Sequence, residues 1–105
     1  MNDPVVVTAT FHPLAGHREV VLEALRVAIP RVHEERGCEI YAITAAPGGD
    51  IFMIEKWTSV ADLDAHAEGA PVVDLNRALE GHLREPVEVV RYAPLPLGQA
   101  AKGQL

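Results

Sequence analysis

The residues from Ile51 to His66 (IFMIEKWTSVADLDAH) change from one hydrophobic pattern to another within one or two positions. The first part is apolar and extended in character, whereas from Thr58 onward the apolar residues recur with a helical period. Ser59 is a favoured helix N-cap, and Asp62 supplies, three residues later, the acid of a capping box. We therefore predict a strand that turns sharply into a short helix, and corners of this kind form pockets over a sheet.

Strand and helix patterns follow one another along the whole chain. The predicted strands cover residues 4–11, 38–46, 51–57 and 86–92. A long helix is predicted over residues 17–36, with a kink or a break at Pro30. Two shorter helices follow, one after Ser59 and one that begins near Pro71. The turn sequence Pro-Gly-Gly-Asp at residues 47–50 predicts a hairpin between the second and third strands.

The resulting order predicts an α+β domain with a ferredoxin-like β-α-β-β-α(α)-β antiparallel sheet. In this topology the helices cover only one face of the sheet. The first strand nevertheless carries Val6 on the face opposite to Val5 and Val7. The third strand likewise carries Phe52 and Ile54 opposite its other apolar residues. An apolar face without helices predicts a partner, and a second copy packed sheet against sheet, as a homodimer, is the simplest one.

The length and composition indicate one domain in a reducing compartment. The 105 residues are predicted to form a single domain over residues 1–93, followed by a tail over residues 94–105 that is disordered or forms a dimer arm. The net charge of −6 excludes a nucleic-acid partner. The chain contains no apolar run long enough for a membrane helix and no signal peptide, so no membrane partner is expected. The single cysteine, Cys38, favours a cytoplasmic location.

Four short motifs occur in a fixed order between Val5 and about Tyr92. They are Gly16, Gly37-Cys38, Glu55-Lys56-Trp57-Thr58-Ser59 and Leu63-Asp64-Ala65-His66. Together they resemble the antibiotic biosynthesis monooxygenase (ABM) domain family. The resemblance implies a dimeric α+β barrel with a pocket in each subunit between the sheet and the helices. Members of this family include cofactor-free oxygenases of anthrones or quinols, heme-degrading enzymes and proteins without known activity.

The resemblance also implies substrate-binding positions, and here the chain departs from the anthrone-oxidising branch. Trp57 and Arg77 match its tryptophan and arginine, but Met53 and Leu63 stand where that branch has an asparagine and a tyrosine. Arg77 lies roughly 150° from the apolar stripe of its predicted helix, so a solvated position or a partner contact competes with substrate binding. Tyr41 lies on a predicted strand and can line either the pocket or the dimer interface. The candidate substrate-binding residues are Met53, Leu63, Tyr41 and Arg77.

Glu55, Trp57 and His66 are the candidate catalytic residues at the corner. Trp57 can form a wall on which a flat aromatic substrate stacks, or it can simply fill the core. Glu55 is a proton acceptor if it is buried without a partner and a structural carboxylate if it is paired, with Arg91 and His66 as conceivable partners. The ordinary pKa of a histidine suits His66 to a general base, and the alternative is a histidine that closes its helix onto the sheet.

No cofactor is expected from the sequence. The remaining histidines have no paired metal-ligand spacing, and the chain has no dinucleotide fingerprint or phosphate-binding loop. The heme-degrading branch requires an asparagine on the first strand and an iron-ligating histidine in the last helix. The matching positions here are Ala9 and Asn76, so heme degradation is not expected.

Two functions therefore remain open. The first is a cofactor-independent monooxygenase that uses molecular oxygen on a small electron-rich aromatic substrate, such as a quinol, an anthrone or a polyketide-like phenol. In this reading His66 is the base, Trp57 the stacking wall and Glu55 the group that orients or tunes the histidine. The second is a non-catalytic dimeric module that binds a small aromatic ligand in the same pocket.

Overall fold

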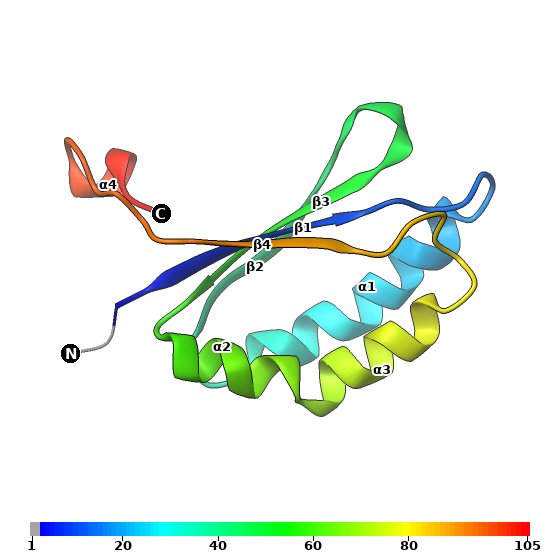
Figure 1. Cartoon of the computed structure of the whole chain (residues 1–105), viewed down its shortest axis with the longest axis horizontal. Helices are drawn as coiled ribbons and strands as arrows, with labels where there is room; N and C mark the ends of the chain where they lie inside the picture. The colour runs from blue at the N-terminus through cyan, green and yellow to red at the C-terminus, as the bar shows by residue number, and fades with distance from the viewer. Residues whose placement is uncertain (1–2) are drawn as a thin grey trace.

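The structure, a computed structural model, describes residues 3–105 and contains one four-stranded sheet with its main helices on one side (Figure 1). The strands are β1 (Val5–Phe11), β2 (Cys38–Ala45), β3 (Ile51–Trp57) and β4 (Glu88–Tyr92), and the helices are α1 (Arg18–His33), α2 (Val60–Ala67), α3 (Ala70–Leu79) and α4 (Ala100–Gly103), with a 3₁₀ turn η1 (Pro47–Gly49) between β2 and β3. All neighbouring strands are antiparallel, in the order β2-β3-β1-β4. The predicted ferredoxin-like α+β fold is confirmed.

The core lies between the sheet and the helices α1, α2 and α3. On β3 the alternate residues Ile51, Met53, Glu55 and Trp57 are buried, and the residues between them are only partly buried. The buried stripe of α1 consists of Val21, Leu25, Ala28 and Val32. These buried positions match the predicted ones, which recur every two residues along a strand and every 3.6 residues along a helix. The strand that carries the candidate site is therefore held against the helices over its whole length.

Pro30 and the segment after Leu79 determine two features of the helices. Helix α1 continues through Pro30 to His33, so a division into two helices is wrong. Pro30 lies in the last turn, where its missing amide hydrogen removes only one bond near a helix end. Helix α3 ends at Leu79 because Glu80 leaves the helical conformation and Gly81 follows with a φ of 80°. Among residues 3–105, no helix is both long enough and apolar enough to cross a membrane.

The other face of the sheet is free of these three helices (Figure 1). Val6, Thr8, Phe52, Ile54 and Tyr92 line a hollow of about 390 Å³ on this face, together with Ala93, Pro94, Leu95 and Leu105 of the C-terminal tail. The tail leaves β4 and forms α4 on the side of the sheet opposite to the main helices (Figure 1). Leu95 and Leu97 of the tail are highly exposed. A tail that serves as a dimer arm stays a prediction.

Candidate active site

The corner between β3 and α2 is held by backbone and side-chain hydrogen bonds. The Ser59 hydroxyl oxygen accepts a hydrogen bond from the Asp62 backbone N–H at 3.1 Å, as the predicted N-cap requires. The backbone N–H of Thr58 donates to the carbonyl of Gly37 at 2.9 Å, which ties the corner to the start of β2. These bonds fix the direction in which α2 leaves the sheet. Trp57 at the end of β3 and His66 in α2 therefore face each other.

Glu55 is a buried carboxylate with one direct hydrogen-bond donor. Its Oε1 accepts a hydrogen bond from the indole N–H of Trp57 at 3.0 Å. Burial is the largest influence and raises the pKa of Glu55, and the nearby carboxylate of Glu35 acts in the same direction. The Trp57 hydrogen bond and the charge of His66 hold the pKa of Glu55 down in part. Glu55 is thus a carboxylate that takes up a proton more readily than an exposed one.

His66 lies between two carboxylates. Its Nδ1 is 2.6 Å from Oε1 of Glu35, and its Nε2 is 3.9 Å from Oε1 of Glu55. Because an ionised carboxylate only accepts hydrogen bonds, Glu35 holds the histidine proton on Nδ1 and leaves the lone pair on Nε2. The Nε2 distance to Glu55 is too long for a hydrogen bond. The imidazole therefore has a free basic nitrogen next to Glu55.

Two aromatic rings enclose the imidazole. The ring of Trp57 lies 4.4 Å from that of His66, centroid to centroid, with a tilt of 33°. Tyr41 approaches His66 edge-on at 5.4 Å. Burial raises the pKa of the Tyr41 phenol, so this residue stays a neutral hydroxyl that can donate a hydrogen bond. The rings restrict the orientation of His66 to the one that its contact with Glu35 favours.

A cavity of about 270 Å³ opens between the sheet and the helices α2 and α3. Its lining is Val7, Ala9, Phe11, Tyr41, Met53, Glu55, Leu63, His66, Ala67, Val72, Leu75, Asn76, Val87, Val89 and Arg91. Most of these side chains are apolar, and Tyr41, Glu55 and His66 form a polar group on the wall. An apolar cavity with a few converging polar groups and a perturbed pKa is the usual form of a ligand site.

A larger hollow of about 360 Å³ lies between the outer surfaces of α1 and α3. Its lining is mainly apolar, with Glu23, Arg31 and Asp74 as its charged residues. These charged side chains are exposed and pair with neighbouring side chains. The cavity beside Glu55 and His66 is therefore the better candidate for chemistry.

The structure brings together most of the residues that the sequence singled out. Tyr41, Met53, Glu55, Leu63 and His66 all line the cavity. Trp57 and Arg77 do not. Trp57 is fully buried behind His66 and Glu55, where it contacts them and not the cavity. Arg77 is exposed and lies 4.0 Å from the Asp74 carboxylate on the outer side of α3.

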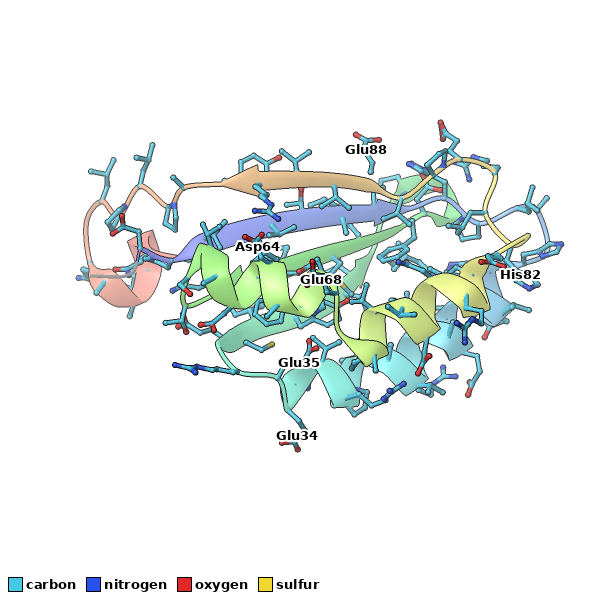
Figure 2. The ribbon with its side chains drawn as sticks, turned by 60° about the horizontal axis from the view of Figure 1, so that its bottom comes forward. Glu34, Glu35, Asp64, Glu68, His82 and Glu88 are labelled. Carbon is cyan, nitrogen blue, oxygen red and sulfur yellow. The ribbon has the colours of Figure 1, made fainter. Side chains whose placement is uncertain are left out.

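Two contacts near the cavity were not predicted from the sequence. Glu35 follows the end of α1 and reaches His66 from there. Figure 2 shows it between α1 and the junction of α2 and α3. Arg91 was one of two conceivable partners of Glu55, but it donates a hydrogen bond to Asp64 at 3.1 Å. No sequence pattern within a single helix or strand indicates either contact, because each one joins residues of separate elements.

Within residues 3–105, no group of three or more histidine, cysteine, aspartate or glutamate side chains is arranged to hold a metal ion. Two histidines outside the cavity, His17 and His82, are in contact, with their Nδ1 atoms 2.9 Å apart. This pair joins the loop before α1 to the loop after α3 and lies outside the cavity lining.

The comparisons with known proteins agree with this fold. The family profile described as antibiotic biosynthesis monooxygenase (ABM) matches residues 4–84. "Putative monooxygenase Rv0793" of Mycobacterium tuberculosis is 35% identical over 97 residues, which cover 90% of this chain and 95% of that protein. "Probable quinol monooxygenase YgiN" of Escherichia coli strain K12 is 31% identical over 91 residues, which cover 77% and 88%.

Solved structures show the same architecture. The structure of Rv0793 from Mycobacterium tuberculosis has a TM-score of 0.84 at 28% identity and covers 91% of this chain and 99% of that chain. The crystal structure of PA3566 from Pseudomonas aeruginosa has a TM-score of 0.82 at 26% identity, with coverages of 90% and 97%. The motifs, the sheet order and these matches lead to one conclusion: the chain belongs to the antibiotic biosynthesis monooxygenase family.

Proposed function

We propose that the chain is a cofactor-independent monooxygenase that acts on an electron-rich quinol, anthrone or related phenol with molecular oxygen. Family membership and the names of the relatives support monooxygenase activity in general. The single observation that carries the finer proposal is the arrangement of His66. Its Nδ1 is engaged by Glu35, and its free Nε2 lies beside Glu55 on the wall of an apolar cavity.

The first step is the removal of a proton from the substrate. Nε2 of His66 accepts the proton, and the imidazolium that forms lies between the carboxylates of Glu35 and Glu55. The face of the Trp57 ring, 4.4 Å away, also stabilises a cation. These groups are already in position before the charge develops, so little reorganisation is needed. The apolar lining keeps water from competing for the proton and for the substrate anion.

The second step joins the substrate anion to oxygen. For an anthrone methylene, the carbanion donates an electron pair to O₂ in two successive one-electron transfers, and a carbon–oxygen bond forms. The peroxide takes up the proton held by His66. Loss of the second methylene hydrogen as a proton then breaks the O–O bond, so that a ketone and one water molecule leave. The methylene carbon is oxidised, both oxygen atoms are reduced, and no further reductant is needed.

Oxygen uptake tests this proposal directly. We expect the protein to consume oxygen in the presence of an anthrone or a reduced quinol in a metal-chelated buffer, above the rate of autoxidation. The ketone from an anthrone, or the hydroxyquinone from a quinol, should form in proportion to the oxygen consumed, with water as the second product. If no member of an anthrone, naphthoquinol and benzoquinol series gives uptake above the uncatalysed rate, the proposal is wrong.

A non-catalytic binding module is the second candidate function. It is favoured by the lining at Met53 and Leu63, where apolar side chains occupy positions that are polar in the anthrone-oxidising branch. An apolar cavity can bind an aromatic ligand without offering the groups that position it for reaction. Tight binding of aromatic ligands together with the absence of turnover in the uptake assay would support this candidate.

We also propose that the protein is a homodimer joined through the sheet face that the three main helices leave uncovered. Val90 and Tyr92 of β4 are large apolar residues exposed on this side, and partly buried Phe52 and Ile54 of β3 lie on the same face beyond β1. An interface of this kind would have a core-like, apolar centre. The cavity lies on the opposite face of the sheet, between the strands and the helices, so the dimer would leave it uncovered. The cytoplasmic location stays a prediction that rests on the single cysteine, Cys38.

A further inference from the structure

One row of residues crosses all four strands beneath the cavity. Tyr41 of β2 is paired with Glu55 of β3, Glu55 with Val7 of β1, and Val7 with Arg91 of β4. Side chains in such a row point to the same face of a sheet. Tyr41, Glu55, Val7 and Arg91 accordingly all line the cavity. Glu55 and Arg91 are two strand spacings apart, or about 10 Å between their backbones.

The two charged residues of this row, Glu55 and Arg91, are opposite in sign and lie on either side of Val7. Glu35 and Glu55 lie on either side of His66, where an anionic group of a ligand would be repelled. Arg91 lies on the other side of Val7 and is the only arginine or lysine on the cavity wall among the residues that the structure describes. A ligand that carries both a hydroxyl and an acidic group can therefore enter in only one favourable orientation.

Arg91 forms an exposed ion pair with Asp64, and a ligand can readily replace Asp64 in this pair. Its guanidinium donates to Oδ1 of Asp64 at 3.1 Å, and Figure 2 shows Asp64 on the side of α2 that faces β4. The side chains are 49% and 62% exposed, respectively. Ion pairs with this exposure contribute little to stability, so their loss is easily offset by a ligand carboxylate in a similar place. A planar guanidinium also suits a carboxylate because it can form two parallel hydrogen bonds.

We propose that the substrate of this cavity carries a carboxylate or a similar acidic group, which Arg91 binds in place of Asp64 while the substrate hydroxyl faces His66. This inference rests on the oxygenase proposal for the role of His66, but the recognition of the acidic group can be tested by binding alone. Val7 lies between Glu55 and Arg91, and Ala9 and Val89 extend the apolar wall beside it. A flat aromatic body with its polar groups at opposite ends fits this arrangement.

The alternative is that the Arg91–Asp64 pair only attaches β4 to α2. A structural pair of this kind would make the two residues equivalent, and replacing either one would lower stability to the same extent. Such a pair would not affect whether the cavity binds an acidic ligand more tightly than a neutral one. Under the proposal the two residues are not equivalent, because Arg91 binds the ligand and Asp64 competes with it.

The test uses two ligands that differ in charge and by one methyl group, 6-hydroxy-2-naphthoate and its methyl ester. Their affinities for the full chain are measured by calorimetry at pH 7 and low ionic strength. The wild-type protein is expected to bind the acid about tenfold more tightly than the ester, as one charge-assisted hydrogen-bonded pair would give. Arg91→Gln should bring the two affinities together, and Arg91→Lys should retain only part of the preference. Asp64→Asn should strengthen binding of the acid alone.

Arg31→Gln is the matched control, because Arg31 forms a similarly exposed pair with Asp74 at 3.0 Å outside the cavity. This variant should keep the wild-type preference. Equal affinities for acid and ester in the wild type, a preference that survives Arg91→Gln, or failure of the acid to bind would each overturn the inference. Oxygen uptake separates it from the oxygenase proposal. If the protein consumes oxygen with neutral quinols but does not bind the acid more tightly than the ester, only this inference is refuted. If it binds the acid more tightly but consumes no oxygen with any substrate, only the oxygenase proposal is refuted.

Discussion

Oε1 of Glu35 lies 2.6 Å from Nδ1 of His66, although 31 positions separate the two residues in the chain. The contact joins the segment after α1 to the last turn of α2. It assigns the two imidazole nitrogens to different tasks, because Nδ1 is occupied by the carboxylate and Nε2 is left to the cavity. Substitutions of Glu35, His66 and Gly69 test this contact, and a substitution of Glu55 tests the buried carboxylate beside it.

His66→Ala is expected to lower kcat with an anthrone or quinol by about 10²- to 10⁴-fold, the usual contribution of a general base. KM should change much less. Steady-state oxygen uptake gives both constants, and size-exclusion chromatography and circular dichroism verify that the variant is folded. His17→Ala serves as the control, because His17 contacts His82 outside the cavity lining and should keep the wild-type kcat. An unchanged kcat in folded His66→Ala would exclude His66 as the base.

Glu35→Gln is expected to lower kcat by about tenfold at unchanged KM. The amide still accepts a hydrogen bond from Nδ1, but it no longer stabilises the imidazolium by its charge. Glu34→Gln is a matched control, since the neighbouring Glu34 points away from the cavity into solvent (Figure 2). If both substitutions have the same effect on kcat, then Glu35 acts only through the general negative charge of the region.

Gly69→Ala is expected to reproduce the effect of Glu35→Gln although no charged residue is replaced. A Cβ at Gly69 would lie 2.7 Å from Oε2 of Glu35, so the carboxylate must move away from His66. The backbone of Gly69 has a φ of −76°, which alanine adopts without strain, so the free energy of unfolding should change by less than about 1 kcal/mol. The kcat of the Gly69→Ala/Glu35→Gln double variant should equal that of the single variants. Additive losses would show that Gly69 acts by another route.

Glu55→Gln is expected to raise the melting temperature at pH 8 but not at pH 4. Burial raises the pKa of Glu55 in the folded protein, so ionisation of Glu55 favours unfolding. Below the ordinary glutamate pKa both states are protonated and this penalty is absent. As the pH rises through the folded pKa the penalty reaches its full size, and the neutral glutamine avoids it while still accepting the Trp57 hydrogen bond. Scanning calorimetry of both proteins between pH 4 and pH 8 measures the difference, and a gain that does not grow with pH would contradict the argument.

Ile54→Lys is expected to weaken the proposed dimer at least tenfold. Ile54 lies on the central strand β3 and faces the hollow on the uncovered side of the sheet. A lysine there would place its charge in an apolar interface. Light scattering over a concentration series measures the assembly, and Val27→Lys on the exposed surface of α1 is the control. A wild-type protein that is monomeric at micromolar concentration would refute the dimer.

Much of this molecule is determined by local patterns in its sequence. The alternation along β3, the N-cap at Ser59 and the stripe from Val21 to Val32 each involve residues that are close in the chain. Their conformations follow from steric and hydrogen-bonding rules that act over a few residues. The order of these elements then restricts the topology to few solutions, which is why the sheet order could be predicted.

The tertiary structure decided which residues meet at the site. Glu35 reaches His66 only because the end of α1 packs against the α2–α3 junction at Gly69, and Arg91 meets Asp64 only because β4 lies beside α2. The sequence left open whether Trp57 lines the cavity or fills the core, and the packing places it in the core behind His66. The rotation and separation of packed elements result from the whole core together, and a shift of one ångström decides whether two side chains meet. No rule that acts along the chain contains that information.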